Sequence, residues 1–247
     1  MSSLPGPLEV EAVILGDQGV LEGASEGTVY VDLTTNAPSV VRRLHRICGQ
    51  KGVGFFDASV SKGSGANAAT IGTLTMMVGG DRETLERARP VLNAIADKDL
   101  IYYCGPSGAG AVCKLCNNMV GFATANALAE ALTIGVKAGV PVETLSEVIA
   151  ASSASRPKIE GFDAVFNRGF EPKDTGFLRA DAKDMRLAVD LARELDVPVE
   201  IAAMIDQRYV AALAAGLGHL SGQAVVKVQE EQAGVELRYT AKTDTIA

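Results

Sequence analysis

Residues 109–138 are the feature of the sequence that most restricts the fold. This stretch contains no proline and is rich in Ala, Leu, Met and Val, which predicts one long helix. Apolar residues lie nearly all round that helix, a pattern typical of a helix buried inside a protein. The pattern of the chain also changes here, because strands are predicted only before residue 105. The long helix therefore marks a boundary between two kinds of structure.

Before this boundary, short β-branched and apolar runs alternate with amphipathic stretches. The sequence predicts strands at 28–32, 52–58, 73–78 and 100–104, with helices at 39–49 and 82–96. After it, helices are predicted at 142–151, 179–195 and 198–215. Alternating strands and helices indicate an α/β layer structure. We therefore expect an α/β domain over residues 1–104, followed by an all-α domain over residues 105–247.

Composition and charge exclude several classes of protein. The chain of 247 residues has 47% apolar and 21% charged residues, which is ordinary globular usage and unlike a disordered chain. Its 23 basic and 30 acidic residues give a net charge of −7 without a basic block, so we expect no nucleic-acid partner. No uninterrupted apolar stretch approaches about 18 residues, and the first residues lack the charged and apolar regions of a signal peptide. Four cysteines and no tryptophan fit a reducing cytosol, so we expect a cytoplasmic protein without a membrane partner.

Histidine chemistry is nearly excluded, because His45 and His219 are the only two histidines in the chain. We therefore expect no metal site and little histidine-based acid–base catalysis.

Lys114 and Asn118 lie four residues apart on the predicted long helix, so both side chains share one face. Their neighbours are Ala, Val, Leu, Cys and Met, and a lysine among such residues is rare unless it is paired or used. Burial and the positive end of the helix dipole both favour the neutral amine, which lowers the pKa of a lysine. Such a lysine can act as a general base near neutral pH. The alternative is a lysine whose stem lies along the helix while its ammonium reaches solvent.

Two glycine-rich turns follow predicted strands. The first is DASVSKGSG at 57–65, whose backbone N–H groups can bind an anion; the alternative is a turn without a ligand. The second is GPSGAG at 105–110, whose order differs from the dinucleotide fingerprint G-x-G-x-x-G. Its acidic partner would be Glu130, which lies inside a predicted helix instead of closing a strand. We therefore interpret the second turn as a tight start to the long helix. A further cluster, DAKD at 181–184, is by itself only a charged patch.

Three stretches together resemble the β-hydroxyacid dehydrogenases, a family that includes 3-hydroxyisobutyrate dehydrogenase and tartronate semialdehyde (2-hydroxy-3-oxopropionate) reductase. They are DASVSKG at 57–63, GTLTMMVGG at 72–80 and GPSGAGAVCKLCNN at 105–118. The resemblance extends to about residue 230. It implies a Rossmann-type NAD(P)-binding domain joined through a long helix to an all-α domain. It also implies reversible hydride transfer between a small 3-hydroxy acid, or its semialdehyde, and NAD or NADP.

The resemblance implies roles for single residues as well. Lys114 matches the catalytic lysine, and Asn118 matches the asparagine that orients the substrate. Ser61 and Gly63 match the loop that holds the substrate carboxylate, and Lys62 lies between them. The residues at positions that contact the cofactor are Leu4, Pro5, Thr35 and Lys183.

The chain departs from the family pattern at two places. The family loop usually reads Asp-Ala-Pro-Val-Ser-Gly-Gly, whereas this chain has Ser59 for the proline and Lys62 for the first glycine. Lys62 either adds attraction for an anionic substrate or blocks it sterically. The family also begins with a strand, a G-x-G-x-x-G turn and a helix that hold the pyrophosphate, and this motif does not occur in the 247 residues. We therefore expect either a start codon placed too late or a truncated relative, and weak NAD(P) binding by the chain alone.

Two other kinds of function stay open at this point. One is a catalytically impaired relative that acts as a binding protein, and the other is an oligomeric interaction protein whose long helix packs between subunits. The pair Lys114 and Asn118 argues against a purely structural role, because packing alone does not need it. The sequence thus predicts a homo-oligomeric oxidoreductase with a small carboxylic-acid substrate.

Overall fold

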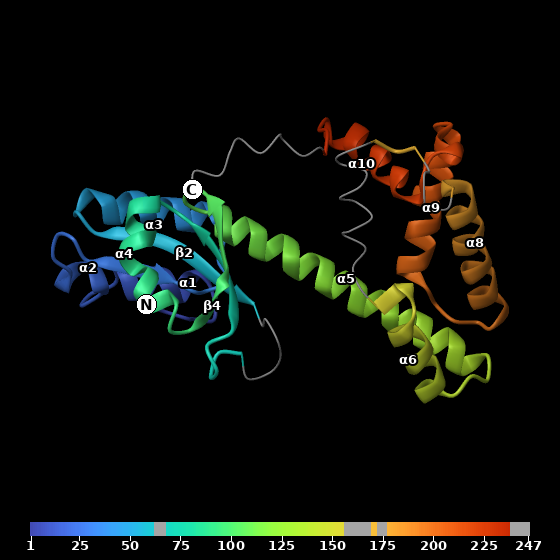
Figure 1. Cartoon of the computed structure of the whole chain (residues 1–247), viewed down its shortest axis with the longest axis horizontal. Coiled ribbons are helices and arrows are strands. Elements are labelled where there is room, and N and C mark those ends of the chain that lie inside the picture. Colours follow the sequence, from blue (N-terminus) through green and yellow to red (C-terminus); the bar gives the residue numbers. More distant parts are fainter. Residues whose placement is uncertain (62–67, 156–168, 172–176, 238–247) are drawn as a thin grey trace. The chain divides into compact units, whose positions relative to one another are not determined.

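The protein, described here by a computed structural model, comprises two compact units, Met1–Phe122 and Ala123–Ala247. The structure describes residues 1–61, 68–155, 169–171 and 177–237. The first unit is built around a four-stranded sheet and the second from helices (Figure 1). The predicted fold class, α/β followed by all-α, is confirmed.

The sheet of the first unit has the order β1-β2-β3-β4. Its strands are β1 (Val29–Asp32), β2 (Gly54–Ser61), β3 (Leu74–Gly79) and β4 (Ala96–Gly105). β1 runs parallel to β2, and their register places Asp32 opposite Asp57. β3 is antiparallel to β2 and parallel to β4. Two polar residues therefore lie side by side on neighbouring parallel strands.

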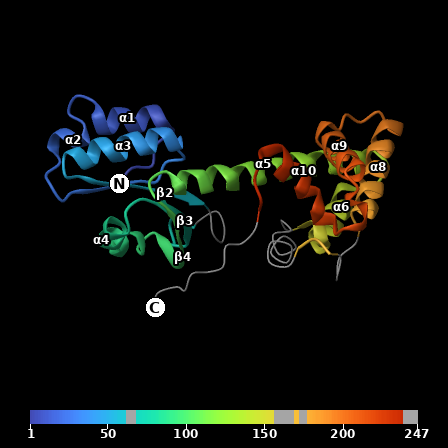
Figure 2. The ribbon, with the colours of Figure 1, turned by 90° about the horizontal axis from the view of Figure 1, so that it is seen from above.

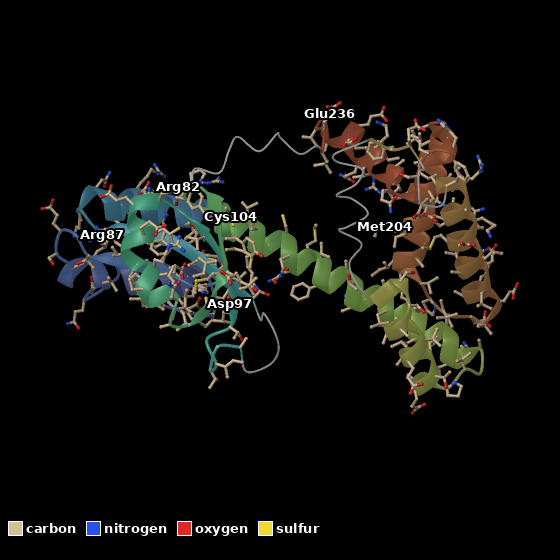
Figure 3. The ribbon with its side chains drawn as sticks, viewed as in Figure 1. Arg82, Arg87, Asp97, Cys104, Met204 and Glu236 are labelled. Atoms are coloured by element: carbon tan, nitrogen blue, oxygen red, sulfur yellow. The ribbon has the colours of Figure 1, made fainter. Side chains whose placement is uncertain are left out.

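Helices cover both faces of this sheet (Figure 2). They are α1 (Pro7–Leu15), α2 (Val20–Gly23), α3 (Pro38–Gln50) and α4 (Arg82–Leu92). Successive strand residues point to opposite faces, so Phe55 packs with Leu44 of α3 while Phe56 packs with Leu85 of α4. Arg82, labelled in Figure 3, lies over the ring of Tyr103 at 4.3 Å from its centroid and ties the start of α4 to β4. The two apolar layers thus hold the sheet from both sides.

The long helix α5 (Ala109–Lys137) begins in the first unit and continues in the second. Its only buried residues are Gly110 and Ala111. The expectation that this helix is buried is therefore wrong for the single chain, where Met119 is 65% exposed. The reason is geometric: among the described residues, the sheet buries only the first turn of the helix, and many of the later apolar side chains stay exposed. By length and composition alone α5 could also cross a membrane, a criterion that core helices of soluble proteins meet as well.

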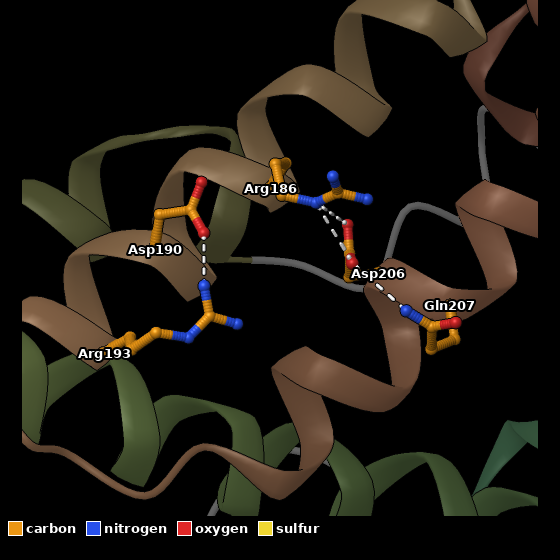
Figure 4. Close-up of polar contacts among 5 residues, drawn as sticks. All are labelled: Arg186, Asp190, Arg193, Asp206 and Gln207. Atoms are coloured by element: carbon orange, nitrogen blue, oxygen red, sulfur yellow. Dashed lines mark hydrogen bonds and ion pairs between the residues drawn. The ribbon is translucent and has the colours of Figure 1, made fainter.

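In the part that the structure describes, the regular elements of the second unit are helices, and one isolated antiparallel bridge joins Phe177 to Ser221. Its elements after α5 are α6 (Val142–Ala151), η1 (Ser153–Ser155), α8 (Leu178–Glu194), α9 (Glu200–Ala214), η2 (Leu217–His219), η3 (Gly222–Val225) and α10 (Val226–Ala233). The Nε of Arg186 on α8 donates to both carboxylate oxygens of Asp206 on α9, at 3.1 and 3.2 Å (Figure 4). Glu130 of α5 accepts hydrogen bonds from the N–H groups of Ile201 and Ala202, at 2.9 and 3.0 Å. A carboxylate from another helix therefore satisfies the free amides at the start of α9.

Candidate active site

Asp57 fixes the start of α5 to the middle of the sheet. Its side chain is fully buried on β2. Oδ1 accepts a hydrogen bond from the N–H of Gly108 at 2.9 Å, and Oδ2 accepts one from the N–H of Ala111 at 2.6 Å. These amides belong to the first turn of α5, where a helix leaves its N–H groups without internal partners. Burial raises the pKa of Asp57, and the hydrogen bonds from the two amides oppose that shift.

Two glycines allow this close approach of helix and sheet. A Cβ at Gly79 would lie 2.7 Å from Asp57 Oδ1 and 2.7 Å from the nitrogen of Gly110. A Cβ at Gly110 would collide with the backbone oxygen of Met77. Side chains at either position would force α5 away from Asp57. The turn at 105–110 is thus the tight helix start that the sequence predicts.

Lys114 lies in α5, one turn beyond Ala111, and is partly buried. Asn118 is partly buried too, whereas Cys113, Leu115 and Cys116 are exposed. The predicted sharing of one helix face is confirmed by this burial pattern. Burial lowers the pKa of the Lys114 amine below its ordinary value. The predicted direction of the shift is therefore confirmed, and its cause is desolvation.

Ser61 is the last residue of β2 and is partly exposed. It lies four residues beyond Asp57, about 13 Å along an extended strand. The strand that ends at Ser61 therefore also carries Asp57, the residue that is hydrogen-bonded to the start of the helix that carries Lys114. Lys62 and Gly63, also predicted for this site, lie outside the described residues.

A second group of buried polar residues lies at the end of β1. Oδ1 of Asp32 accepts a hydrogen bond from the N–H of Thr34, and Oδ2 accepts one from Asn36 Nδ2, both at 3.0 Å. All three residues are buried, and they leave Thr35 exposed between them. The loop that carries Thr35 is therefore held in place by its neighbours.

The Leu4–Pro5 segment is joined to this loop. The N–H of Leu4 donates to Thr34 Oγ1 at 3.0 Å, and Pro5 beside it is exposed. Ser59, which stands where the family pattern has proline, donates its hydroxyl to the backbone oxygen of Thr34 at 3.1 Å. The structure thus brings the predicted cofactor residues Leu4, Pro5 and Thr35 together at the carboxyl end of β1, where ligands bind in open α/β sheets.

Lys183, the remaining predicted residue, belongs to α8 in the second unit. It is exposed, and its Nζ lies 2.9 Å from Oδ1 of Asp184. A cavity of about 220 Å³ between α8 and α9 has Lys183, Arg179 and Tyr209 in its lining. The side chain of Lys183 is therefore accessible to a ligand that binds between α8 and α9.

The chain closely matches proteins of known activity. It is 38% identical to 2-(hydroxymethyl)glutarate dehydrogenase of Eubacterium barkeri, over 96% of this chain and 77% of the relative. It is 34% identical to 3-hydroxyisobutyrate dehydrogenase of Pseudomonas aeruginosa, over 77% of this chain and 68% of the relative. The chain belongs to the β-hydroxyacid dehydrogenase family. The resemblance drawn from the sequence is confirmed.

Family models and a solved structure agree with this membership. Residues 1–105 match the NAD-binding domain of 6-phosphogluconate dehydrogenase. Residues 108–229 match the NAD-binding domain of NADP-dependent 3-hydroxyisobutyrate dehydrogenase. The structure of Mycobacterium tuberculosis 3-hydroxyisobutyrate dehydrogenase with L-serine is 30% identical, with a TM-score of 0.55 over 92% of this chain and 77% of that one. The chain is thus an NAD(P)-dependent oxidoreductase of the 3-hydroxyacid dehydrogenase type, with NAD or NADP as its cofactor.

The residues at the end of β1 fit such a cofactor. Thr35 and Pro5 are exposed, while hydrogen bonds of the buried residues Thr34 and Asp32 hold the backbone next to them. The loop that carries Thr35 is therefore held in a defined conformation, with Thr35 accessible to a ligand. The expected weak binding of NAD(P) by the 247 residues alone stays a prediction.

Proposed function

We propose that this β-hydroxyacid dehydrogenase oxidises a small 3-hydroxy acid, and reduces the corresponding semialdehyde, with Lys114 as the proton-transfer residue. The observation that supports this role most directly is the place of Lys114. It is a partly buried amine of lowered pKa, one turn beyond the anchored start of α5 and on one face with Asn118. A lowered pKa increases the fraction of neutral amine, which is the form that can accept a proton.

Bound NAD(P) supplies the hydride acceptor in one direction and the hydride donor in the other. In oxidation, the neutral amine of Lys114 takes the proton of the substrate hydroxyl as the hydride leaves the carbon that bears it. In reduction, the Lys114 ammonium returns that proton to the carbonyl oxygen. Asn118 donates a hydrogen bond from its side-chain amide to the same oxygen and holds it beside the amine. The geometry of this pair serves both directions, because each group addresses one atom of the substrate.

The carboxylate of the substrate binds at the end of β2 in this proposal. Ser61 offers a hydroxyl donor, Gly63 offers its backbone N–H, and Lys62 adds a positive charge. The relatives are named for 2-(hydroxymethyl)glutarate and 3-hydroxyisobutyrate, and one structure contains L-serine. All three compounds share a 3-hydroxypropanoate core that differs only in its substituent at carbon 2. We therefore propose 2-substituted 3-hydroxypropanoates as the substrate class.

The cofactor contacts in this proposal are Leu4, Pro5, Thr35 and Lys183. The protein is proposed to act in the cytoplasm as a homo-oligomer, without nucleic-acid or membrane partners. The exposed apolar side chains of α5 support the oligomer, because a second copy would remove them from water.

Replacement of Lys114 by methionine tests the proposal, since it keeps the length of the side chain and removes the amine. We expect Lys114→Met to lower kcat by about 100-fold or more for the best acid of a 3-hydroxypropanoate panel, the range that general acid–base catalysis supplies. Lys98→Met is the matched control, because Lys98 is an exposed lysine of β4 in the same unit. A Lys114→Met protein that folds and turns over within threefold of the wild type would contradict the role of Lys114.

A further inference from the structure

We infer that Asp57 is a positioning residue of the reaction: its carboxylate holds the first turn of α5 and thereby sets the place of Lys114. This inference rests on the proposed role of Lys114 and extends it to a residue that no substrate or cofactor contacts in the mechanism above.

The contacts of Asp57 are those of a carboxylate that caps a helix of another element. Both oxygens are used, one by the N–H of Gly108 and the other by the N–H of Ala111, at 2.9 and 2.6 Å. A protonated side chain would point a hydrogen at one of these amides, so the ionised form is the one that fits. A negative charge at a helix N-terminus is also stabilised by the helix dipole. The two bonds are therefore of the strong, charge-assisted kind.

The hydrogen bonds of Asp57 lie so close to Lys114 that a small shift of the helix there would also move the reacting amine. Lys114 follows Ala111 by three residues, less than one turn of a rigid helix. Gly110 and Ala111 in this first turn are the buried residues of α5, so the first turn is where the helix is packed most closely. Gly79 and Gly110 keep the helix in contact with Asp57, since a side chain at either would collide there. Loss of the two bonds would let the start of α5 shift, and a shift of about 1 Å at a reacting group can cost 100-fold in rate.

Asp32 provides a matched comparison. It is opposite Asp57 in the register of β1 and β2, and it is equally buried. Its carboxylate holds Thr34 and Asn36 instead, which places it under the Thr35 loop rather than under α5. Neighbouring strands therefore carry two similar carboxylates that position different parts of the site. Their variants should fail in different ways.

The test compares Asp57→Asn, Asp57→Ala and Asp32→Asn in the full chain. Asparagine keeps one acceptor for the α5 amides and alanine keeps none, so kcat should fall about 10-fold in Asp57→Asn and further in Asp57→Ala. The KM values for NAD(P) and for the best 3-hydroxypropanoate should stay within about threefold, because the groups that bind them are intact. Asp32→Asn should instead raise the KM for NAD(P), and its effect on kcat should be smaller than its effect on this KM. Amide hydrogen exchange gives a readout apart from turnover: at Gly108 or Ala111 it should accelerate about 10-fold or more in Asp57→Asn, and not in Asp32→Asn.

The outcomes separate this inference from the proposed function. If Lys114→Met is inactive while Asp57→Asn keeps the wild-type kcat, the inference is overturned and the role of Lys114 stands. If Lys114→Met stays active, the proposed function fails, and the exchange of the α5 amides still decides whether Asp57 anchors them. Equal losses in Asp57→Asn and Asp32→Asn, with the same effect on KM, would show general destabilisation and overturn the inference. Should Asp57→Ala not fold, Asp57→Asn alone decides.

Discussion

The lowered pKa of Lys114 sets the direction of the pH dependence. Oxidation needs the neutral amine, so its rate should rise with pH through the pKa of Lys114, at a pH below the ordinary lysine value of about 10.4. Reduction needs the ammonium, so its rate should fall as the pH rises through the same pKa. Asn118→Asp would place a carboxylate four residues away on the same face, which favours the charged amine and raises the pKa of Lys114. The limb measured in kcat/KM for oxidation should therefore move to higher pH in this variant. A limb that stays in place would show that another group titrates.

Single residues of the site were predictable where local spacing determines them. Lys114 and Asn118 were found because i, i+4 spacing on an apolar helix is a property of the sequence alone. Asp57 and Asp32 gave a weaker signal, a carboxylate in or after an apolar strand run. Their partners include Gly108 and Ala111, which are more than fifty residues from Asp57 in the chain. Such pairing depends on tertiary structure, so its function in positioning α5 could not be inferred beforehand.

Secondary structure elements were predicted best where a hydrophobic repeat is long. The strands β1 to β3 and the helices α3, α5, α6, α8 and α9 lie within a few residues of their predicted ranges. The helix predicted over 82–96 ends at Leu92, because β4 begins at Ala96 and pairs with Leu74 of β3. The charged residues 97–99 do not suggest a strand, and only the partner strand makes one there. α1 and α10 were missed: α1 buries only Val10 and Ile14, too few residues to give a clear repeat.

The pair Arg186 and Asp206 should be the polar contact on which the packing of α8 against α9 most depends. Asp206 is buried, so Arg186→Met would leave its carboxylate without the main charged partner, which is costly in a protein interior. We expect Arg186→Met to lower the Tm more than Asp206→Asn does, because the latter removes the buried charge. Arg193→Met is the control: Arg193 pairs with Asp190 at 2.9 Å on the exposed side of α8 (Figure 4), and such pairs contribute little. Equal melting shifts for Arg186→Met and Arg193→Met would contradict this ranking.

The boundary between the two units lies inside α5, because different elements pack against the two ends of this helix. Compact packing ends near Phe122, inside the helix, whereas the alternation of strands and helices in the sequence ends near residue 105. The position near Phe122 reflects contacts between residues, whereas the position near residue 105 reflects the pattern of the sequence. A boundary of domains at 104 stays a prediction. The wrong expectation of a buried α5 has the same origin, because a sequence pattern shows that a helix should be covered and not which chain covers it.

A second copy of this chain is our prediction for what covers α5. Leu115, Met119 and Val136 are 42%, 65% and 50% exposed along the helix, and stable dimers bury roughly 800 Å² on each partner. Light scattering on the purified protein should therefore give at least a dimeric mass. Met119→Lys would place a charge in that contact and should lower the mass at equal concentration. Met204→Lys is the matched control, since Met204 of α9 is 61% exposed and labelled in Figure 3. A monomeric wild type would contradict the prediction, and its flotation with phosphatidylcholine vesicles would show that a lipid bilayer covers the helix instead.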